Sequence, residues 1–184
     1  MSKRPSVVKG LIVGVAAGYA ATLVMDQFQS LLATAQKASE KQKKLAEGES
    51  PWLIANEQAQ QEMKQKDTDN APDKVARKIA EVTGTTIPKE QIKSAGQAVH
   101  FIFGTLMGIG YSVAAEFLPE VTSGGGTAFS TLLFLGGDEV VIPALHLSPP
   151  PTKQPAGSHL QYWAAHIVYG GTLELTRTLL RRFI

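Results

Sequence analysis

The stretch "VVKGLIVGVAAGYAATLVM", residues 7–25, is the first of four apolar blocks along the chain. A helix needs about 20 apolar residues to cross the roughly 30 Å hydrocarbon core of a bilayer. This stretch is long enough, and its apolar character continues toward Ala33. It therefore predicts a transmembrane helix over about residues 7–33. A signal peptide is an alternative reading, because Lys3 and Arg4 precede the block, but the polar Asp26 in its distal half weakens that reading.

Three further blocks have a similar length and predict helices over about residues 95–118, 127–147 and 159–180. Only 18% of the 184 residues are charged, compared with roughly 25% in soluble domains. These features together predict an all-α fold, a four-helix transmembrane bundle that forms a single membrane domain over residues 1–184. The alternative is a soluble helical bundle with buried helices.

The segment between the first two blocks, residues 36–94, is polar and contains helix-start signals at Ser50 and before Pro72. It predicts a polar helical insert. Basic residues flanking the membrane helices set topology, and they place both termini in the cytoplasm and the insert on the opposite side. These basic residues are Lys3, Arg4, Lys9, Arg177, Arg181 and Arg182. An apolar stripe in the insert is expected to pack on the bundle or lie at the membrane interface: Val75, Ala76, Ile79, Ala80 and Val82.

Polar residues occur within all four apolar blocks. In an up-and-down bundle, Asp26, His100, Asp138 and His166 would lie at one depth, roughly 9 to 14 Å inside the same boundary. Glu139 is adjacent to Asp138. Acids at such a depth are costly unless they are paired, protonated, hydrated or bound to a ligand.

Several functions fit this predicted cluster. It could handle protons or ions, or hold a metal ion through His100, His166, Asp138 and Glu139. It could hold a haem between His100 and His166. It could also be a structural polar network that fixes the helix register. The cofactor is therefore unknown from the sequence.

Other polar residues are secondary candidates, namely Tyr111, Glu116 and Glu174. Glu174 and Arg177 are three residues apart and can pair at the surface. His146 and His159 flank a proline-rich link and are expected to be solvated.

Small residues predict where helices pack closely. Gly10, Gly14 and Gly18 repeat every four residues, and such ridges let backbones approach each other. Further packing glycines are predicted on the other helices: Gly104, Gly108 and Gly170. Gly136 and Gly137 are expected to loosen the third helix, and Pro143 to free the carbonyl of Glu139.

Several function classes lack support. The net charge is +2 and no basic patch is present, so nucleic-acid binding is not indicated. The absence of cysteine excludes disulfides and thiolate metal sites. No nucleophile motif, phosphate loop or metalloprotease motif occurs, and the sequence does not support an enzyme. The expected partners are the lipid bilayer, together with further copies of the chain or a larger membrane complex.

The C-terminal half resembles the YagU-like family of bacterial inner-membrane proteins, whose function is unknown. The resemblance rests on His100, "GYSVAAEFLP" (110–119), "PALHLSPP" (143–150) and "AHIVYGGTLELTR" (165–177), in this order. It covers roughly the last 90 residues and implies a multi-pass protein of the bacterial inner membrane. It is faint in the first helix, and the insert departs from the family pattern.

The leading hypothesis is a small inner-membrane protein whose Asp/His/Glu cluster handles protons, ions or a small solute. The alternatives are a structural or accessory subunit of a membrane complex, and a metal- or haem-binding membrane protein.

Overall fold

The computed structural model describes residues 5–184, and within them the chain forms helices and no strands. The all-α class is therefore confirmed. The α-helices are α1 (Val7–Ala46), α2 (Pro51–Asp67), α3 (Ala71–Val82), α4 (Ile92–Phe117), α5 (Thr127–Leu133), α6 (Ile142–Ala144) and α7 (Ala156–Phe183). The shorter helical segments are η1 (Lys89–Gln91), η2 (Pro119–Gly126), η3 (Phe134–Val141) and η4 (Pro151–Lys153).

Three helical stretches are long and apolar enough to cross a membrane: Val7–Ala46, Lys89–Phe117 and Pro119–Ala144. They match the first three predicted spans. The fourth predicted span lies in α7, which is not among these three. A bundle of four membrane-crossing helices therefore stays a prediction, whereas three candidate spans are found by length and composition.

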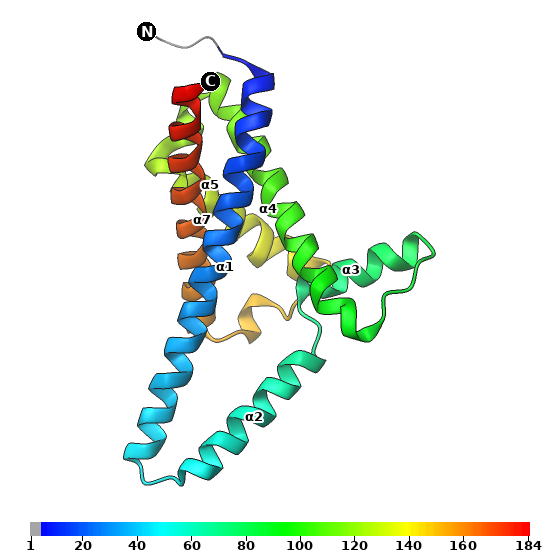
Figure 1. Ribbon diagram of the computed structural model, residues 1–184, viewed down its shortest axis with the longest axis vertical. Coiled ribbons are helices and arrows are strands. Elements are labelled where there is room, and N and C mark those ends of the chain that lie inside the picture. The colour runs from blue at the N-terminus through cyan, green and yellow to red at the C-terminus, as the bar shows by residue number, and fades with distance from the viewer. Residues whose placement is uncertain (1–4) are drawn as a thin grey trace.

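Helix α1 lies between α4 and α7, and α7 packs in turn against α5 (Figure 1). The beginning of α1 and the end of α7 lie at the same end of the molecule (Figure 1). The core between these helices is formed by Ala17, Ala21, Met25, Tyr111, Ala165, Tyr169 and Leu173. The Tyr169 hydroxyl donates a hydrogen bond of 2.6 Å to the carbonyl of Gly104, which links α7 to α4.

Glycines allow α1 and α4 to approach backbone to backbone. A Cβ atom on Gly14 would lie 2.5 Å from the Cα of Ile109, and one on Gly10 would lie 2.9 Å from the Cα of Val113. Any larger residue would push the two helices apart. The remaining predicted packing glycines also lie at close helix contacts: Gly18 against Thr105, Gly104 against Thr22, Gly108 against Gly18, and Gly170 against Ser130.

Helix α1 is longer than predicted and ends at Ala46, so the predicted end near residue 33 is too early. Its last part is rich in Ala, Lys, Glu and Gln, which favour helix without any apolar partner. At 1.5 Å per residue α1 is about 60 Å long, twice the hydrocarbon thickness. The helix is therefore longer than a single crossing needs, and the predicted insert begins inside it.

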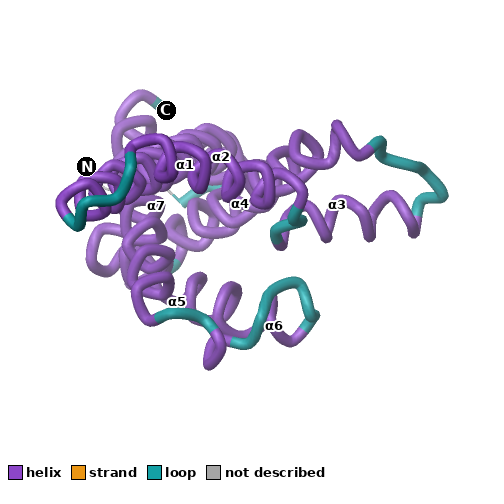
Figure 2. Tube along the Cα trace, turned by 90° about the horizontal axis from the view of Figure 1, so that it is seen from below, coloured by secondary structure: helices purple, strands orange, loops and turns teal. Residues whose placement is uncertain are grey.

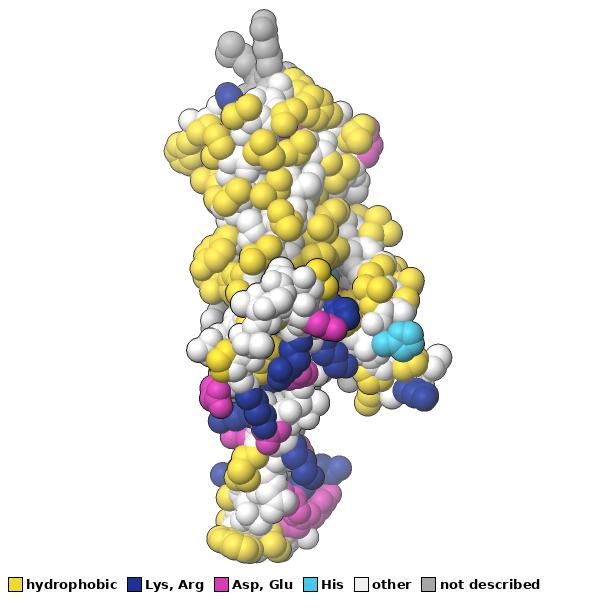
Figure 3. All heavy atoms as spheres, turned by 90° about the vertical axis from the view of Figure 1, so that its right-hand side faces the viewer, with side chains coloured by type: hydrophobic (Ala, Val, Ile, Leu, Met, Phe, Trp, Pro, Cys, Tyr) yellow, Lys and Arg dark blue, Asp and Glu magenta, His cyan; other side chains and the backbone are white. Residues whose placement is uncertain are grey.

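Helix α2 folds back along the protruding part of α1. Ion pairs hold the two together, with Lys37 2.9 Å from Glu62 and Lys44 2.5 Å from Glu57. Only Ile54 of α2 is buried. Charged side chains gather on the lower part of the molecule, whereas the upper part is almost entirely hydrophobic (Figure 3). This division matches a protein embedded in a bilayer at one end and exposed to water at the other.

The third predicted span is not a regular α-helix. Between α5 and α6, η3 is a π-helix, in which the amide of Ile142 donates to the carbonyl of Gly137 five residues earlier. Gly136 and Gly137 loosen the helix at this place, and Pro143 cannot donate a backbone hydrogen bond to continue the α-helical pattern. The predicted loosening of this helix therefore takes the form of a π-helix that carries Asp138 and Glu139.

Candidate functional site

His166 on α7 faces the carboxylate of Asp138 on η3. Its Nε2 atom lies 3.9 Å from the Asp138 Oδ2 atom, and its ring is buried. Its Nδ1 atom lies 2.8 Å from the carbonyl oxygen of Tyr162. Because a carbonyl only accepts hydrogen bonds, Nδ1 carries a proton and donates it. Nε2 is therefore the atom that can gain a second proton, and it points toward the acid across a gap too long for a direct hydrogen bond.

His100 on α4 adds a second imidazole. Its Nε2 atom is buried and has no hydrogen-bond partner. Electrostatic interactions connect this ring with Asp26, Asp138 and His166. A buried polar atom without a partner is rare in proteins and calls for a specific explanation.

Asp26 brings α1 to the same region. Its Oδ2 atom accepts a hydrogen bond of 3.0 Å from the side-chain amide of Gln97 on α4. We refer to these four residues, which come from four helical segments, as the Asp–His cluster: Asp26, His100, Asp138 and His166. His166 and Asp138 are the pair that face each other directly. The sequence analysis predicts one depth for these four residues, and their convergence into one site stays a prediction.

Glu139 points to a different partner, His159. The Nδ1 atom of His159 lies 2.7 Å from the Glu139 Oε1 atom, and its Nε2 atom lies 3.1 Å from the carbonyl oxygen of Pro151. Nε2 must donate to that carbonyl, so a further proton lies between His159 and Glu139, on one or the other. The side chain of His159 is 26% exposed, so it stays in contact with solvent while it pairs with Glu139. Its spacing of seven residues from His166, two helical turns, is the signal that could have placed both histidines on one face of α7.

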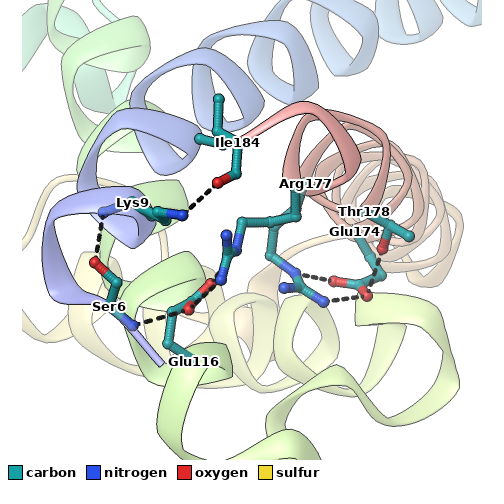
Figure 4. A network of polar contacts seen from close by, with 8 residues as sticks. Ser6, Lys9, Glu116, Glu174, Arg177, Thr178 and Ile184 are labelled. Carbon is teal, nitrogen blue, oxygen red and sulfur yellow. Dashed lines mark hydrogen bonds and ion pairs between the residues drawn. The ribbon is translucent and has the colours of Figure 1, made fainter. Parts of the chain in front are cut away.

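At the opposite end of the molecule, Glu116 and Arg181 form a buried ion pair with two parallel contacts (Figure 4). These contacts measure 2.5 Å and 2.7 Å, and the Ser6 amide donates to the same carboxylate at 3.1 Å. The side chains of Glu116 and Arg181 are only 4% and 11% exposed. Lys9 donates to the carbonyl oxygen of Ile184 beside them. These contacts join the start of α1 to the ends of α4 and α7.

Glu174 is the centre of the second half of this network (Figure 4). Its carboxylate accepts two bonds from Arg177, at 2.6 Å and 2.7 Å, one from the Tyr111 hydroxyl at 2.8 Å and one from Thr178 at 3.0 Å. The predicted pair of Glu174 and Arg177 is present, but it is mostly buried rather than on the surface. We call the contacts around Glu116 and Glu174 the terminal network. It contains all three secondary candidates, Tyr111, Glu116 and Glu174.

The structure does not assemble the predicted metal-ligand set. Among residues 5–184, no group of three or more His, Asp or Glu side chains is arranged to hold a metal ion. Within the predicted set, Glu139 pairs with His159 instead. The haem hypothesis needs only His100 and His166 and stays a prediction.

The fold and these two polar regions define a helical protein suited to a membrane, with ionisable residues inside its apolar helices. A family model described as "Protein of unknown function (DUF1440)" matches residues 71–175, and the chain belongs to this family. The match begins at the first residue of α3 and includes His100, Asp138, Glu139 and His166. No curated protein and no solved structure matches the chain.

Proposed function

We propose that this chain is a membrane protein that takes up and releases protons at the Asp–His cluster. The observation that carries this proposal is the position of His166, whose proton-accepting Nε2 faces the Asp138 carboxylate at 3.9 Å. The unpartnered Nε2 of His100 supplies a second acceptor beside it. Three candidate spans provide the membrane setting.

The chemistry of the cluster suits proton exchange near neutral pH. An imidazole has an ordinary pKa of about 6.5, so it changes charge within the physiological range. A proton gained by His166 would be stabilised by Asp138, and this lowers the cost of a charge at this depth. The same pair could instead hold a small cation, because the carboxylate is 33% exposed.

The pair of Glu139 and His159 would connect this cluster to the water on the insert side. His159 precedes His166 by seven residues, or about 10 Å along α7. The acids Asp138 and Glu139 are neighbours on η3, and each faces one of these histidines. Their position on a π-helix supports a functional role, since π-helical turns are frequent at functional sites.

The predicted setting completes the proposal. We infer a bacterial inner membrane from the sequence resemblance, and cytoplasmic chain ends from the basic residues that flank the helices. The protruding part of α1, α2 and α3 would then lie on the non-cytoplasmic side, and protons would enter the cluster from there.

A flux assay in proteoliposomes tests this function. Purified protein is reconstituted around a pH-sensitive dye, and a potassium diffusion potential drives proton entry. Wild-type protein is expected to acidify the lumen faster than empty vesicles do, and Asp138→Asn and His166→Ala are expected to remove the difference. His146→Ala is the matched control, because His146 is exposed and lies outside the cluster. A wild-type protein that conducts nothing under any pH or ion gradient would refute the proposal.

A second candidate function is that of a subunit in a larger membrane assembly. The specific observation is a mostly apolar groove on the outer face of α1 and α4, lined by Tyr19, Phe101, Ile102, Thr105 and Leu106. A transmembrane helix of a partner or of a second copy could fill this groove. Native mass spectrometry of protein extracted in mild detergent tests this candidate, because a purely monomeric protein would oppose it.

A further inference from the structure

Helix α3 has one apolar flank that no other part of the described chain covers. One side of α3 is buried against α4 through Asp73, Ala76 and Ala80. Ile79 lies next to that buried side and Val82 points away from it, and they are 52% and 78% exposed. The apolar stripe noted in the sequence is therefore only half covered by the protein.

Contacts of Asp73, in the first turn of α3, determine which side of this helix faces α4. Asp73 is almost completely buried and contacts Lys93 of α4 at 2.5 Å. Asp73 also forms a capping box with Asn70 at the start of the helix, in which each side chain accepts a hydrogen bond from the backbone amide of the other residue. Gly96 of α4 lies directly against Asp73, where a larger residue would collide with it. These contacts decide which flank of α3 faces which way.

The charged flank of α3 faces the water-exposed side of the molecule. Arg77 pairs at 2.5 Å with Asp69, which lies in the short link between α2 and α3. Each residue of an α-helix advances by about 100°, so Ile79 points about 200° away from Arg77, and Val82 points about 140° away. The uncovered apolar flank therefore points away from Arg77 and from the charged link that Arg77 contacts.

Helix α3 also lies at the level where the apolar and charged parts of the molecule meet. It extends sideways from the beginning of α4, across the long axis of the molecule (Figures 1 and 2). Lys74 donates a hydrogen bond of 2.8 Å to the carbonyl oxygen of Leu147, the last residue of the predicted third span. A helix in this place lies along the membrane surface if the spans cross the bilayer.

We propose that α3 is an interfacial helix whose Ile79–Val82 flank is inserted among the lipid headgroups and upper acyl chains. Its partner is the bilayer surface itself, and the apolar flank continues the bilayer-facing surface of α4. Amphipathic helices with one apolar face and one charged face bind membranes in this way. The charges of α3 are paired within the protein, as in Arg77 with Asp69 and Lys78 with Glu81, so binding depends on apolar burial and not on anionic lipids.

Single-cysteine labelling tests this proposal on the complete protein. The chain contains no cysteine, so Ile79→Cys and Val82→Cys each give one labelling site for an environment-sensitive fluorophore. Arg77→Cys is the matched control, because Arg77 lies on the opposite side of the helix, about 160° from Ile79 and about 140° from Val82 when measured the shorter way around the axis. Each variant is reconstituted in phosphatidylcholine vesicles that contain lipids with a nitroxide quencher near the headgroup or near the chain end.

Labels at 79 and 82 are expected to be quenched at least twofold more by the shallow nitroxide than by the deep one, and to resist aqueous iodide. The label at 77 is expected to be quenched by iodide. Adding phosphatidylserine should leave these results unchanged. Equal iodide quenching at all three sites would overturn the proposal. Labels at 79 and 82 shielded from both iodide and nitroxides would also overturn it, since a protein partner would then cover the flank.

Discussion

The two polar regions of this molecule contain similar residues but are built differently. In the terminal network, Glu116 meets Arg181 through two short contacts and Glu174 accepts four hydrogen bonds. In the Asp–His cluster, the nearest charged atoms of Asp138 and His166 are 3.9 Å apart, and the His100 Nε2 has no partner. The carboxylates of the terminal network therefore have several short hydrogen bonds each. The Asp–His cluster instead contains an imidazole nitrogen that can still accept a hydrogen bond or a proton.

This difference indicates what each region is for. A buried carboxylate whose hydrogen bonds are all satisfied holds helix ends in place, and removing one partner leaves an uncompensated charge. Groups that retain bonding capacity can accept a proton, a water molecule or an ion without breaking the fold. The terminal network therefore stabilises the structure, and the Asp–His cluster is the better candidate for function.

Breaking the terminal network should have the largest effect on stability. Arg181→Met would leave Glu116, whose side chain is 4% exposed, without its bidentate partner. Loss of one member of a buried ion pair costs about 3 to 5 kcal/mol. Thermal or denaturant unfolding of the detergent-solubilised protein measures this cost. The double variant Glu116→Met with Arg181→Met should recover most of the loss, because an apolar pair avoids the unpaired charge. A single variant as stable as wild type would contradict the assigned role of the network.

Disturbing the glycine contact between α1 and α4 should have a smaller effect. In Gly14→Ala the new Cβ atom would lie 2.5 Å from the Cα of Ile109, and neither backbone can move without separating the helices. Overpacking of this kind costs about 1 to 3 kcal/mol. The same unfolding measurement applies, with Gly110→Ala as the control because a Cβ atom there meets nothing within 4 Å. Equal stability of the two variants would show that the helices adjust freely.

Much of the fold could be predicted because a helix that crosses a bilayer needs a certain length and an apolar composition, and both can be read from the sequence. Length and apolar composition identified the first three spans, and a spacing of four residues identified the glycines between α1 and α4. Counting residues from the helix ends predicts one depth for Asp26, His100, Asp138 and His166, because the rise per residue of a helix is constant. Of these, His166 and Asp138 face each other in the structure.

Other features depend on information that hydrophobicity does not carry. The extension of α1 to Ala46 follows from helix propensity in a polar segment, and the π-helix follows from a local change of hydrogen-bond register. That register rotates Glu139 toward His159. The pair of Glu116 and Arg181 joins residues 65 positions apart, and arginines at a helix end were read only as topology signals.

Changing the Asp–His cluster should affect stability less than Arg181→Met or Gly14→Ala. Asp138→Asn keeps the shape of the side chain, which is 33% exposed and 3.9 Å from its nearest charged partner. A weak, partly exposed ion pair contributes about 0 to 1 kcal/mol. The unfolding transition should therefore shift by no more than this amount, while proton flux is lost. A loss of stability similar to that of Arg181→Met would show instead that the cluster is a network that fixes the helix register.

The smallest effect is expected outside the membrane, where α2 is held to α1 by exposed ion pairs. A hydrogen bond from Lys37 lowers the pKa of Glu62. A carboxyl group whose pKa is lowered in the folded state stabilises that state above its unfolded pKa, about 4.3 for Glu, and loses the effect as the pH falls further. The contact between α1 and α2 should therefore loosen in acid. Spin labels at Ala38→Cys and Ala59→Cys should report a broader distance distribution at pH 4 than at pH 7.

Removing the acid from this contact tests whether the ion pair causes the pH effect. In the Glu62→Gln variant, Lys37 loses its charged partner at every pH. The label distances should then be broadened already at pH 7, and acidification should change them less than in the parent protein. Helix α2 buries only Ile54, so no apolar core opposes this opening. An unchanged distribution between pH 4 and pH 7 in the parent protein would mean that Ile54 and the short turn after α1 hold α2 in place without the ion pair.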